Sequence, residues 1–476
     1  MKEKRFLLMA ASLIIVIAMI TGCASPATPA PQQTQPPAAE QPPAEQPPAE
    51  QATEPPASAG PVVVQYWSNG WFPSAIDGRM KLVEKFNEEY KGKIQVEYVQ
   101  GNWDNGEQYL QNGIAAGGGI ACIVEWYVDG ALDWYRKGYV LDLRPYITPE
   151  IQGLMDEAQW KARTADDGAV VINGTVLGAP ILTLMYNPAY FQEAGITPAT
   201  PENPWTWDQL FENAKLLTVD KNGKHLGEDG FDKNNVAHWG LVERLDNEKV
   251  WEYGLTFSQN VMGKAVVREE NGVWGWYLDD AAAKAYERFL TPISLGITPE
   301  ASIGLTGDTQ EQMLADGTAA IIMRETFAIP AIHSNYPDAK FDVMPIPAEK
   351  GENWYYQAGG EGMVLTKTCD HPKEAAEYLF WLMKPENNAI YGYGNYMAPA
   401  NAQAMDYEPF KSDAQFNIIR YYMAHGKSFV SPFNVNLPEF RDTVASPTLM
   451  DVVSGKITFA EANKVLSEQA KEILNR

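Results

Sequence analysis

Aromatic residues stand beside amide or carboxylate residues where three predicted strands end. These ends are Trp67-Ser-Asn69-Gly-Trp71, Gln100-Gly-Asn-Trp103-Asp104 and Glu125-Trp126. Aromatic rings stack on the C–H face of a sugar ring, and amides or carboxylates bond to its paired hydroxyls. Each Trp taken alone could equally cover the edge of a sheet as part of a core. The same pairing at three strand ends favours a carbohydrate site.

Strands and helices alternate through the first part of the chain. Strand patterns occupy residues 61–67, 94–99 and 120–127, and helix patterns occupy 75–90, a stretch ending at 117–119, and 129–137. This alternation predicts a parallel sheet with helices on both faces. Ligands of such sheets bind beyond the carboxyl ends of the strands, where the aromatic and polar residues stand.

The run Leu177–Pro188 is apolar between a Gly-Ala-Pro entry and an Asn-Pro exit, which are breaker signals around about six extended residues. We expect a strand that carries the backbone into a second lobe, with Tyr186 facing a cleft between the lobes. The alternative is an interior strand of one large domain.

The second half begins with a capping-box helix from Thr206 to Leu217. Strands are predicted at 239–242 and 318–323, and helices at 279–289, 309–315, from Pro372 and at 458–474. The stretch 356–366 is interpreted as a second crossing between lobes, in which Gly359 and Gly360 let the backbone approach a ligand closely. The polar loop 220–235 faintly resembles a calcium loop, but the twelve-residue pattern is incomplete, so a solvated loop is expected.

The N-terminus has the features of an export signal. Lys2, Lys4 and Arg5 precede the apolar run Phe6–Ile20, which is shorter than the roughly 20 residues of a spanning helix. The run ends in Ile-Thr-Gly-Cys23 and resembles a bacterial lipoprotein signal, which implies a lipid-modified Cys23. Residues 1–22 are therefore predicted to be a signal peptide, and the Pro-rich segment 23–60 a disordered tether.

Composition sets further limits. The 476 residues suggest two or three domains, and the net charge of −24 argues against nucleic acid as a partner. The three Cys form no metal-ligand spacing. Cys122 and Cys369 are expected to be unpaired, although a bridge between them stays open.

A search for catalytic motifs argues against an enzyme. The five His form no HExxH, and Gly-x-Ser-x-Gly and phosphate-loop motifs are absent from the sequence. No cofactor and no metal are expected. A glycoside hydrolase needs only two spaced carboxylates and stays an alternative. A surface adhesin that binds polysaccharide is a second alternative.

Six stretches, read in order, resemble the sugar-binding family of extracellular solute-binding proteins, the malto-oligosaccharide-binding-like lipoproteins of ABC importers. They are 131–147, 184–188 with 191–196, 204–210 with 214–218, 231–240, 313–320 and 369–379. The resemblance implies an α/β fold of two lobes that close like a clamshell, each a mixed, mostly parallel sheet flanked by helices. Two or three hinge strands would join an N-terminal lobe of 61–180 and about 367–402 to a C-terminal lobe of about 181–366 and 403–476.

The resemblance also implies a site and partners. The expected ligand-binding residues are Trp67, Asn69, Trp71, Trp103, Asp104, Glu125, Trp126, Tyr186, Trp251, Glu325, Phe327, Gly359 and Gly360. A monomer on the outer face of the cell membrane, anchored through Cys23, would pass a mono- or oligosaccharide to ABC permease subunits. Glu125-Trp126 and Arg324-Glu325 depart from the family pattern, so charged or unusual sugars stay open.

Overall fold

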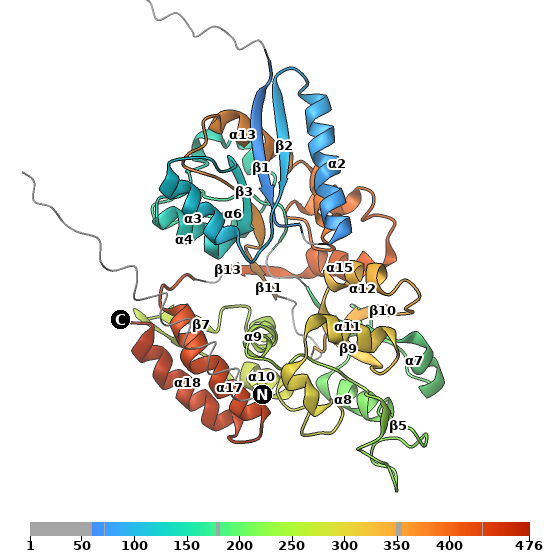
Figure 1. Cartoon of the computed structure of the whole chain (residues 1–476). Helices are drawn as coiled ribbons and strands as arrows, with labels where there is room; N and C mark the ends of the chain where they lie inside the picture. The colour runs from blue at the N-terminus through green and yellow to red at the C-terminus, as the bar shows by residue number, and fades with distance from the viewer. Residues whose placement is uncertain (1–59, 71, 178–180, 349–354, 431) are drawn as a thin grey trace, which may run out of the picture. The chain divides into compact units, whose positions relative to one another are not determined.

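The computed structural model describes residues 60–70, 72–177, 181–348, 355–430 and 432–476 (Figure 1). Contacts divide the chain into Met1–Ala57 and a compact unit, Ser58–Arg476. The predicted signal peptide, Cys23 and nearly all of the predicted tether lie outside the described residues. Within the described ranges, no helix has the length and apolar character to cross a membrane.

The first sheet has the strand order β12-β3-β1-β2. It consists of β1 (Val62–Ser68), β2 (Ile94–Gln100), β3 (Ile123–Tyr127) and β12 (Glu361–Leu365). β1 runs parallel to β2 and β3, as the alternating pattern predicted, and β12 runs antiparallel to β3. β12 belongs to this sheet, although its residues were assigned to the second lobe, whose boundary was predicted at about residue 366. The chain has re-entered the first lobe by Glu361.

Helices bury apolar faces against this sheet. In α2 (Pro73–Glu89), Leu82, Val83 and Phe86 recur at helical spacing and join Val64 and Tyr66 of β1 in one core. The other helices of the first lobe are α3 (Gly106–Ala116), α4 (Val128–Arg136), α5 (Pro149–Gln152), α6 (Glu157–Ala162), α13 (Pro372–Trp381) and α14 (Pro385–Gly394).

The second sheet has the order β10-β4-β9 and belongs to a second lobe with its own large core. β4 (Leu182–Tyr186) is antiparallel to both β9 (Ile321–Glu325) and β10 (Asp342–Pro345), so these strands depart from the mostly parallel arrangement expected for each lobe. The strand predicted at 239–242 contributes only the two parallel bridges Trp239 to Ala319 and Val242 to Ile322. β4 is thus an interior strand of this sheet, and the preceding Gly-Ala-Pro entry lies outside the described residues.

Ten α-helices follow or precede these strands in the second lobe. They are α7 (Pro188–Ala194), α8 (Trp207–Leu216), α9 (Lys249–Met262), α10 (Asp280–Phe289), α11 (Gly307–Ala315), α12 (Ala328–Asn335), α15 (Asn417–His425), α16 (Leu437–Phe440), α17 (Ser446–Val453) and α18 (Phe459–Ile473), counted within the described ranges. The predicted capping box of Thr206 and Gln209 is present at α8. A second capping box opens α18.

A two-stranded parallel sheet links the lobes. β11 (Tyr355–Ala358) pairs with β13 (Lys427–Val430), and the pair packs against α6 of the first lobe and α9 of the second (Figure 1). β11 leads through Gly359 and Gly360 directly into β12, which fits the second crossing predicted at 356–366. Two further hairpins, β5 (Val219–Asp220) with β6 (Val236–His238) and β7 (Val267–Glu270) with β8 (Val273–Trp276), lie in the second lobe.

Cys122 and Cys369 form a disulfide, so the expectation that both are unpaired was wrong. They are 247 residues apart in sequence. The pairing of β12 with β3 brings them together, because the amide of Thr366 donates to the carbonyl of Cys122 and the amide of Cys369 donates to the carbonyl of Thr366. No local sequence signal reports that pairing.

Candidate functional site

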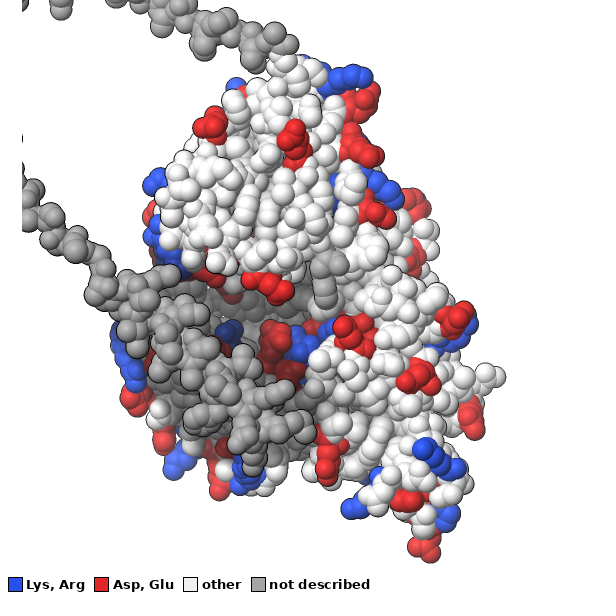
Figure 2. All heavy atoms as spheres, viewed as in Figure 1, with Lys and Arg blue, Asp and Glu red and all other residues white. Residues whose placement is uncertain are grey.

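A cavity of about 390 Å³ lies at the edge of the first sheet where β1 and β2 end. Its walls are formed by Asn69, Phe72, Arg79, Asn102, Trp103, Asp104, Phe327, Glu361, Asn395 and Met397. Figure 2 shows the surface of the described chain hollowed across its middle, with acidic and basic side chains gathered in the hollow. Phe327 comes from the second lobe, so the cavity has walls from both lobes.

The topology explains why these residues meet. β1 and β2 are parallel neighbours, with Ser68 opposite Gln100 at their carboxyl ends. The loops that follow therefore leave the same edge of the sheet, and they bring Asn69, Trp103 and Asp104 to one cavity. This is the convergence predicted from the strand ends. Trp71 lies outside the described residues.

Trp103 provides an aromatic face in this wall. Its ring centroid is 5.3 Å from that of Trp126 and 6.4 Å from that of Tyr127. Trp126 is buried and stacks in turn on Trp134, 4.7 Å away. Trp126 thus supports Trp103 from the core side and is not itself part of the cavity wall.

Trp67 is also a core residue. It is 3% exposed and stacks on Tyr109, with 5.0 Å between ring centroids. Gly101 and Gly106 pack directly on its ring, because a Cβ at Gly101 would lie 2.1 Å from the indole. The prediction that Trp67 contacts ligand is not supported by this position, and the alternative of a Trp that covers the sheet edge describes it better.

The carboxylate of Glu125 is bonded to neighbouring side chains. Its carboxylate forms a fully buried ion pair with Arg79 and accepts hydrogen bonds from Tyr66 (2.7 Å) and Ser68 (2.9 Å). Burial raises its pKa, but the Arg79 charge and the hydrogen bonds outweigh this and lower the pKa overall. The predicted ligand carboxylate is therefore a structural one, because its acceptor sites are used within the protein.

Arg79 was not identified from the sequence, since it lies on α2, 46 residues before Glu125. Besides Glu125, its guanidinium donates to the Ala75 carbonyl, to Asn395 Oδ1 and to the Tyr391 hydroxyl. Five N–H groups have five acceptor contacts in all. Arg79 thus lines the cavity without a donor left over.

Asn69 lines the cavity and has an acceptor oxygen that the described residues do not use. Its Nδ2 donates to the Glu125 carbonyl at 2.8 Å, which fixes the orientation of the amide. Its Oδ1 is buried and has no hydrogen-bond partner among the described residues. A buried acceptor without a partner is costly, so a ligand donor at this point would be favourable.

Glu361 is a second residue that sequence reasoning missed. It is the first residue of β12, lines the cavity and is partly exposed there. Withdrawal from water raises its pKa to about 7, with a further increase from Glu125 and a decrease from Arg79. Within the described chain no side chain pairs with its carboxyl. The usable signal was an acidic residue between the Gly359-Gly360 turn and a buried strand.

Gly359 and Gly360 shape the turn before Glu361 and are not among the residues that line the cavity. Both have positive φ values, 134° and 87°. A Cβ at Gly360 would lie 2.6 Å from backbone atoms of Val176 and Leu177. The close backbone approach predicted here exists, but within the described residues it is made to the protein's own chain.

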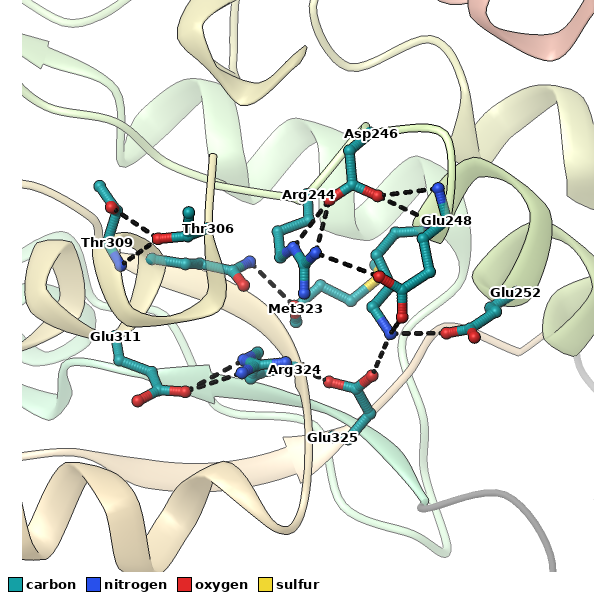
Figure 3. Close-up of polar contacts among 12 residues, drawn as sticks. Arg244, Asp246, Glu248, Glu252, Thr306, Thr309, Glu311, Met323, Arg324 and Glu325 are labelled. Atoms are coloured by element: carbon teal, nitrogen blue, oxygen red, sulfur yellow. Dashed lines mark hydrogen bonds and ion pairs between the residues drawn. The ribbon is translucent and has the colours of Figure 1, made fainter. Parts of the chain in front are cut away.

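Phe327, at the end of β9, lines the cavity from the second lobe as predicted. The guanidinium of Arg324 lies 5.1 Å from its ring centroid. Arg324 is buried and bonds to Glu311 at 2.9 Å and to Glu325 at 2.6 Å. Phe327 thus stands between the cavity and a buried network of charges, which Figure 3 shows.

Glu325 is the centre of that network rather than a cavity residue. One carboxylate oxygen contacts Arg324 and the other lies 3.0 Å from Lys249 Nζ. Burial raises the pKa of Glu325, but the two cations bring it down to about 2. Lys249 also contacts Glu252 at 2.5 Å and Glu248 at 3.2 Å, and Arg244 contacts Asp246 at 2.6 Å (Figure 3).

Tyr186 and Trp251 lie in the core of the second lobe. In the pairing of β4 with β9, Tyr186 at the end of β4 lies opposite Ile321. Leu182 at the start of β4 lies opposite Glu325, which is close to Phe327 in the chain. The prediction that Tyr186 faces the cleft was wrong, because it is at the opposite end of β4 and packs on Phe191. Trp251 of α9 packs on Trp276 and Phe440 and is likewise buried.

The described residues contain no cluster of three or more His, Cys, Asp or Glu arranged to hold a metal ion. In the loop 220–235, Asp220 accepts backbone hydrogen bonds from Asn222, Lys224 and Asp232. These contacts use the carboxylate of Asp220 to fold the loop.

The site combines one aromatic face on each side with polar acceptors between them. Trp103 and Phe327 supply the faces, and Asn69, Asp104 and Glu361 supply the acceptors. Rings of this kind bind the apolar face of a small molecule, and the acceptors bind its O–H or N–H groups. Such an arrangement can hold a polar ring compound.

Comparison with known proteins gives a matching family and similar proteins of the same fold. The model of a family described as bacterial extracellular solute-binding protein matches residues 81–418. A curated relative is an uncharacterized lipoprotein in the oleD 5′ region of Streptomyces antibioticus, 24% identical over 426 residues, which covers 86% of this chain and 87% of the relative.

Two solved structures share the fold. The sugar-binding protein MalE of Xanthomonas citri is 16% identical, with a TM-score of 0.69, over 87% of this chain and 98% of its own. The GacH receptor of Streptomyces glaucescens, solved unliganded and with acarbose, is 15% identical, with a TM-score of 0.67, over 88% of this chain and 99% of its own. The expected two-lobed α/β fold is confirmed.

Proposed function

Since the chain belongs to the bacterial extracellular solute-binding proteins, we propose that it is the substrate-binding lipoprotein of a carbohydrate ABC importer. It captures a mono- or oligosaccharide between its two lobes and delivers it to the permease subunits in the membrane. The family places the protein outside the cytoplasm. The sugar-binding proteins that share its fold support carbohydrate as the ligand.

One observation carries the proposal: Trp103 and Phe327 line a single cavity with Asn69, Asp104 and Glu361. A sugar ring stacked on Trp103 would present its hydroxyls to the three acceptors. Phe327 would cover the ring from the second lobe. The predicted ligand residues Trp103, Asp104, Asn69 and Phe327 are thus proposed as the contact set, and Glu361 is added to it.

Binding favours closure because the walls belong to different lobes. A ligand that contacts both walls stabilises the arrangement in which they are close, and the linking pair β11 and β13 lies where the motion would bend the chain. A micromolar Kd corresponds to about −8 kcal/mol. Two aromatic faces and several hydrogen bonds to carboxylates are of the right size to supply it after the cost of ordering.

We also propose that Cys23 carries a lipid after removal of residues 1–22, and that the Pro-rich segment to residue 60 is a spacer from the membrane. The lipoprotein character of the Streptomyces antibioticus relative supports this reading. The spacer would be extended, at about 3.1 Å per residue, and hold the lobes on the order of 100 Å from the lipid. The protein would work as a monomer.

The proposal is tested by a thermal-shift screen of the purified protein against a panel of mono- and oligosaccharides. A ligand that binds only the native state stabilises it, by about 2.7 kcal/mol at a ligand concentration of 100 times Kd, and so raises the melting temperature. Hits are followed by calorimetry and by analysis of the recovered sugar. Release of reducing ends would identify a glycoside hydrolase instead, and polysaccharide binding without lobe closure would identify an adhesin.

A further inference from the structure

We propose that the cavity selects a sugar that carries an ammonium group, an amino sugar, over the neutral sugar of the same linkage. This inference rests on the proposed function, because it names the class of carbohydrate that the same cavity takes. It follows from the donors and acceptors that the protein leaves available in the cavity.

Among the described residues that line the cavity, Arg79 is the one cation, and its hydrogen-bond donors are all used within the protein. The five N–H groups of Arg79 donate hydrogen bonds to Glu125, Ala75, Asn395 and Tyr391. Its charge is balanced by the buried Glu125 at the same place. Arg79 therefore offers a ligand neither a hydrogen-bond donor nor an uncompensated positive charge.

The acceptors of the cavity, by contrast, are available. Asn69 Oδ1 is buried and unpartnered among the described residues, and the opposite end of this amide is fixed by its bond to the Glu125 carbonyl. The carboxyls of Glu361 and Asp104 line the same space, and no side chain of the described chain pairs with either. The unused polar groups of this wall are therefore hydrogen-bond acceptors, and two of them are acidic groups without a paired cation in the described part of the chain.

Among the described residues that line the cavity, the second lobe contributes Phe327 and no cation. Behind Phe327, each cation is bound to carboxylates: Arg324 to Glu311 and Glu325, and Lys249 to Glu325 and Glu252. The network in Figure 3 contains three cations and five carboxylates, namely Arg244, Lys249, Arg324, Asp246, Glu248, Glu252, Glu311 and Glu325. This side of the cavity also has an acidic excess.

A neutral sugar would satisfy the hydrogen bonds but not the charge. Its hydroxyls can donate to Asn69 and to the carboxyls, yet on lobe closure Glu361 would either stay ionised without a counter-ion or have to take up a proton, and either outcome weakens binding at and above neutral pH. An ammonium group donates up to three hydrogen bonds and supplies the counter-ion. Trp103 adds an aromatic face on which a cation is also favourable.

The test compares matched ligands by calorimetry on the purified protein. Glucosamine and short glucosamine oligosaccharides are measured beside the glucose and N-acetylglucosamine compounds of the same linkage. We expect at least tenfold tighter binding of an amine than of both matched neutral forms. The preference should weaken as salt rises, because it rests on charge.

Two variants locate the effect. Glu361→Gln should lower the affinity for the amine at least tenfold and reduce the preference to threefold or less. Glu84→Gln, a matched change on the exposed face of α2, should leave both unchanged. If Glu361→Gln does not fold, the ligand comparison and the salt series on the unmodified protein decide the matter alone.

The failures are distinguishable. Neutral sugars that bind as tightly as the matched amines, or a preference that survives Glu361→Gln, overturn this inference and leave the proposed function standing. A panel in which neither amines nor neutral sugars bind overturns both.

Discussion

Trp103 is the aromatic residue of the first lobe that we place in the ligand site, in contrast to its neighbours in the core. It lines the cavity, while its neighbours Trp126 and Trp134 are buried beneath it. We predict that Trp103→Ala weakens sugar binding at least tenfold, which corresponds to about 1.4 kcal/mol, with little loss of stability. Calorimetric titration and thermal unfolding of the same preparation measure the two effects.

Two changes elsewhere are the controls for Trp103. Trp274→Ala on β8 removes a partly exposed indole far along the second lobe and should leave affinity unchanged. Tyr186→Ala should cost about 3–5 kcal/mol of stability, because the ring is buried, but not affinity. Equal affinity of Trp103→Ala and the unmodified protein would remove Trp103 from the site.

Glu361 gives a prediction about pH in the absence of ligand. Its folded pKa of about 7 lies above the ordinary 4.5, so stability is lost as pH rises from about 4.5 to about 7. Arg79 of α2, Glu125 of β3 and Tyr391 of α14 are the charged and titratable groups that act on it. Glu361→Gln removes this loss, so we expect the variant to gain about 1–3 kcal/mol over the unmodified protein between pH 5 and pH 8.

Chemical denaturation at each pH measures that difference, with Glu84→Gln as the matched control. A difference between Glu361→Gln and the unmodified protein that stays constant from pH 5 to pH 8 would show that Glu361 titrates normally.

Residue types and spacing predicted part of the proposed site. Asn69, Trp103 and Asp104 were predictable because parallel neighbouring strands bring their following loops to one edge. The ion pair of Glu125 was not predictable, because its partner Arg79 is on a helix and only the fold places the two together. Trp67, Trp251 and Tyr186 were predicted to contact ligand but lie in the cores. The local sequence around a buried aromatic residue is the same as that around an aromatic residue that stacks on a ligand.

At the scale of elements, the network behind Phe327 holds the end of β9 to α9 and α11. Glu325 bonds to both Arg324 and Lys249, and its side chain is 6% exposed. We predict that Glu325→Gln costs about 2–4 kcal/mol of unfolding free energy, because two buried cations lose a shared counter-ion. Since the pKa of Glu325 is lowered to about 2, the cost is largest above about pH 4.5 and shrinks as pH falls toward 2.

Glu248→Gln is the matched change for that experiment. Glu248 contacts the same Lys249, but its side chain is 59% exposed, so its loss should cost under about 1 kcal/mol. Urea unfolding of both variants at pH 7 and pH 3 compares them. An equal loss of unfolding free energy in the Glu325→Gln and Glu248→Gln variants would contradict the prediction that the buried contacts of Glu325 stabilise the fold more.

The disulfide gives a second prediction at this scale. Cys122 precedes β3 and Cys369 follows β12, at the end of those strands opposite to Glu361. We predict that replacing both with Ser lowers stability by about 2–5 kcal/mol and leaves sugar affinity within twofold. Unfolding with and without reductant provides the control, since the double variant should not respond. A reductant-insensitive unmodified protein would contradict a closed disulfide.

The pattern of elements was predictable where the local signal is strong. The capping box of α8 and the strand–helix alternation of the first lobe were found in place. The pairing of β12 with β3 and the antiparallel direction of β4 were not, because strand partners far apart in sequence are chosen by the tertiary packing of the whole lobe.

At the scale of the whole molecule, the chain crosses between two cores, each with its own sheet, and the cavity takes walls from both. This arrangement fits the proposed function, in which the lobes enclose a ligand between them and release it to the permease. The two-lobed fold was predictable only from the resemblance of the full chain, because no single motif specifies it.

The most direct measurement is calorimetric titration of the purified protein with the sugars that raise its melting temperature, followed by analysis of the recovered sugar. The account predicts saturable binding of one sugar per chain and recovery of that sugar chemically unchanged. A complete panel without binding, or a sugar that is cleaved during the titration, would contradict it.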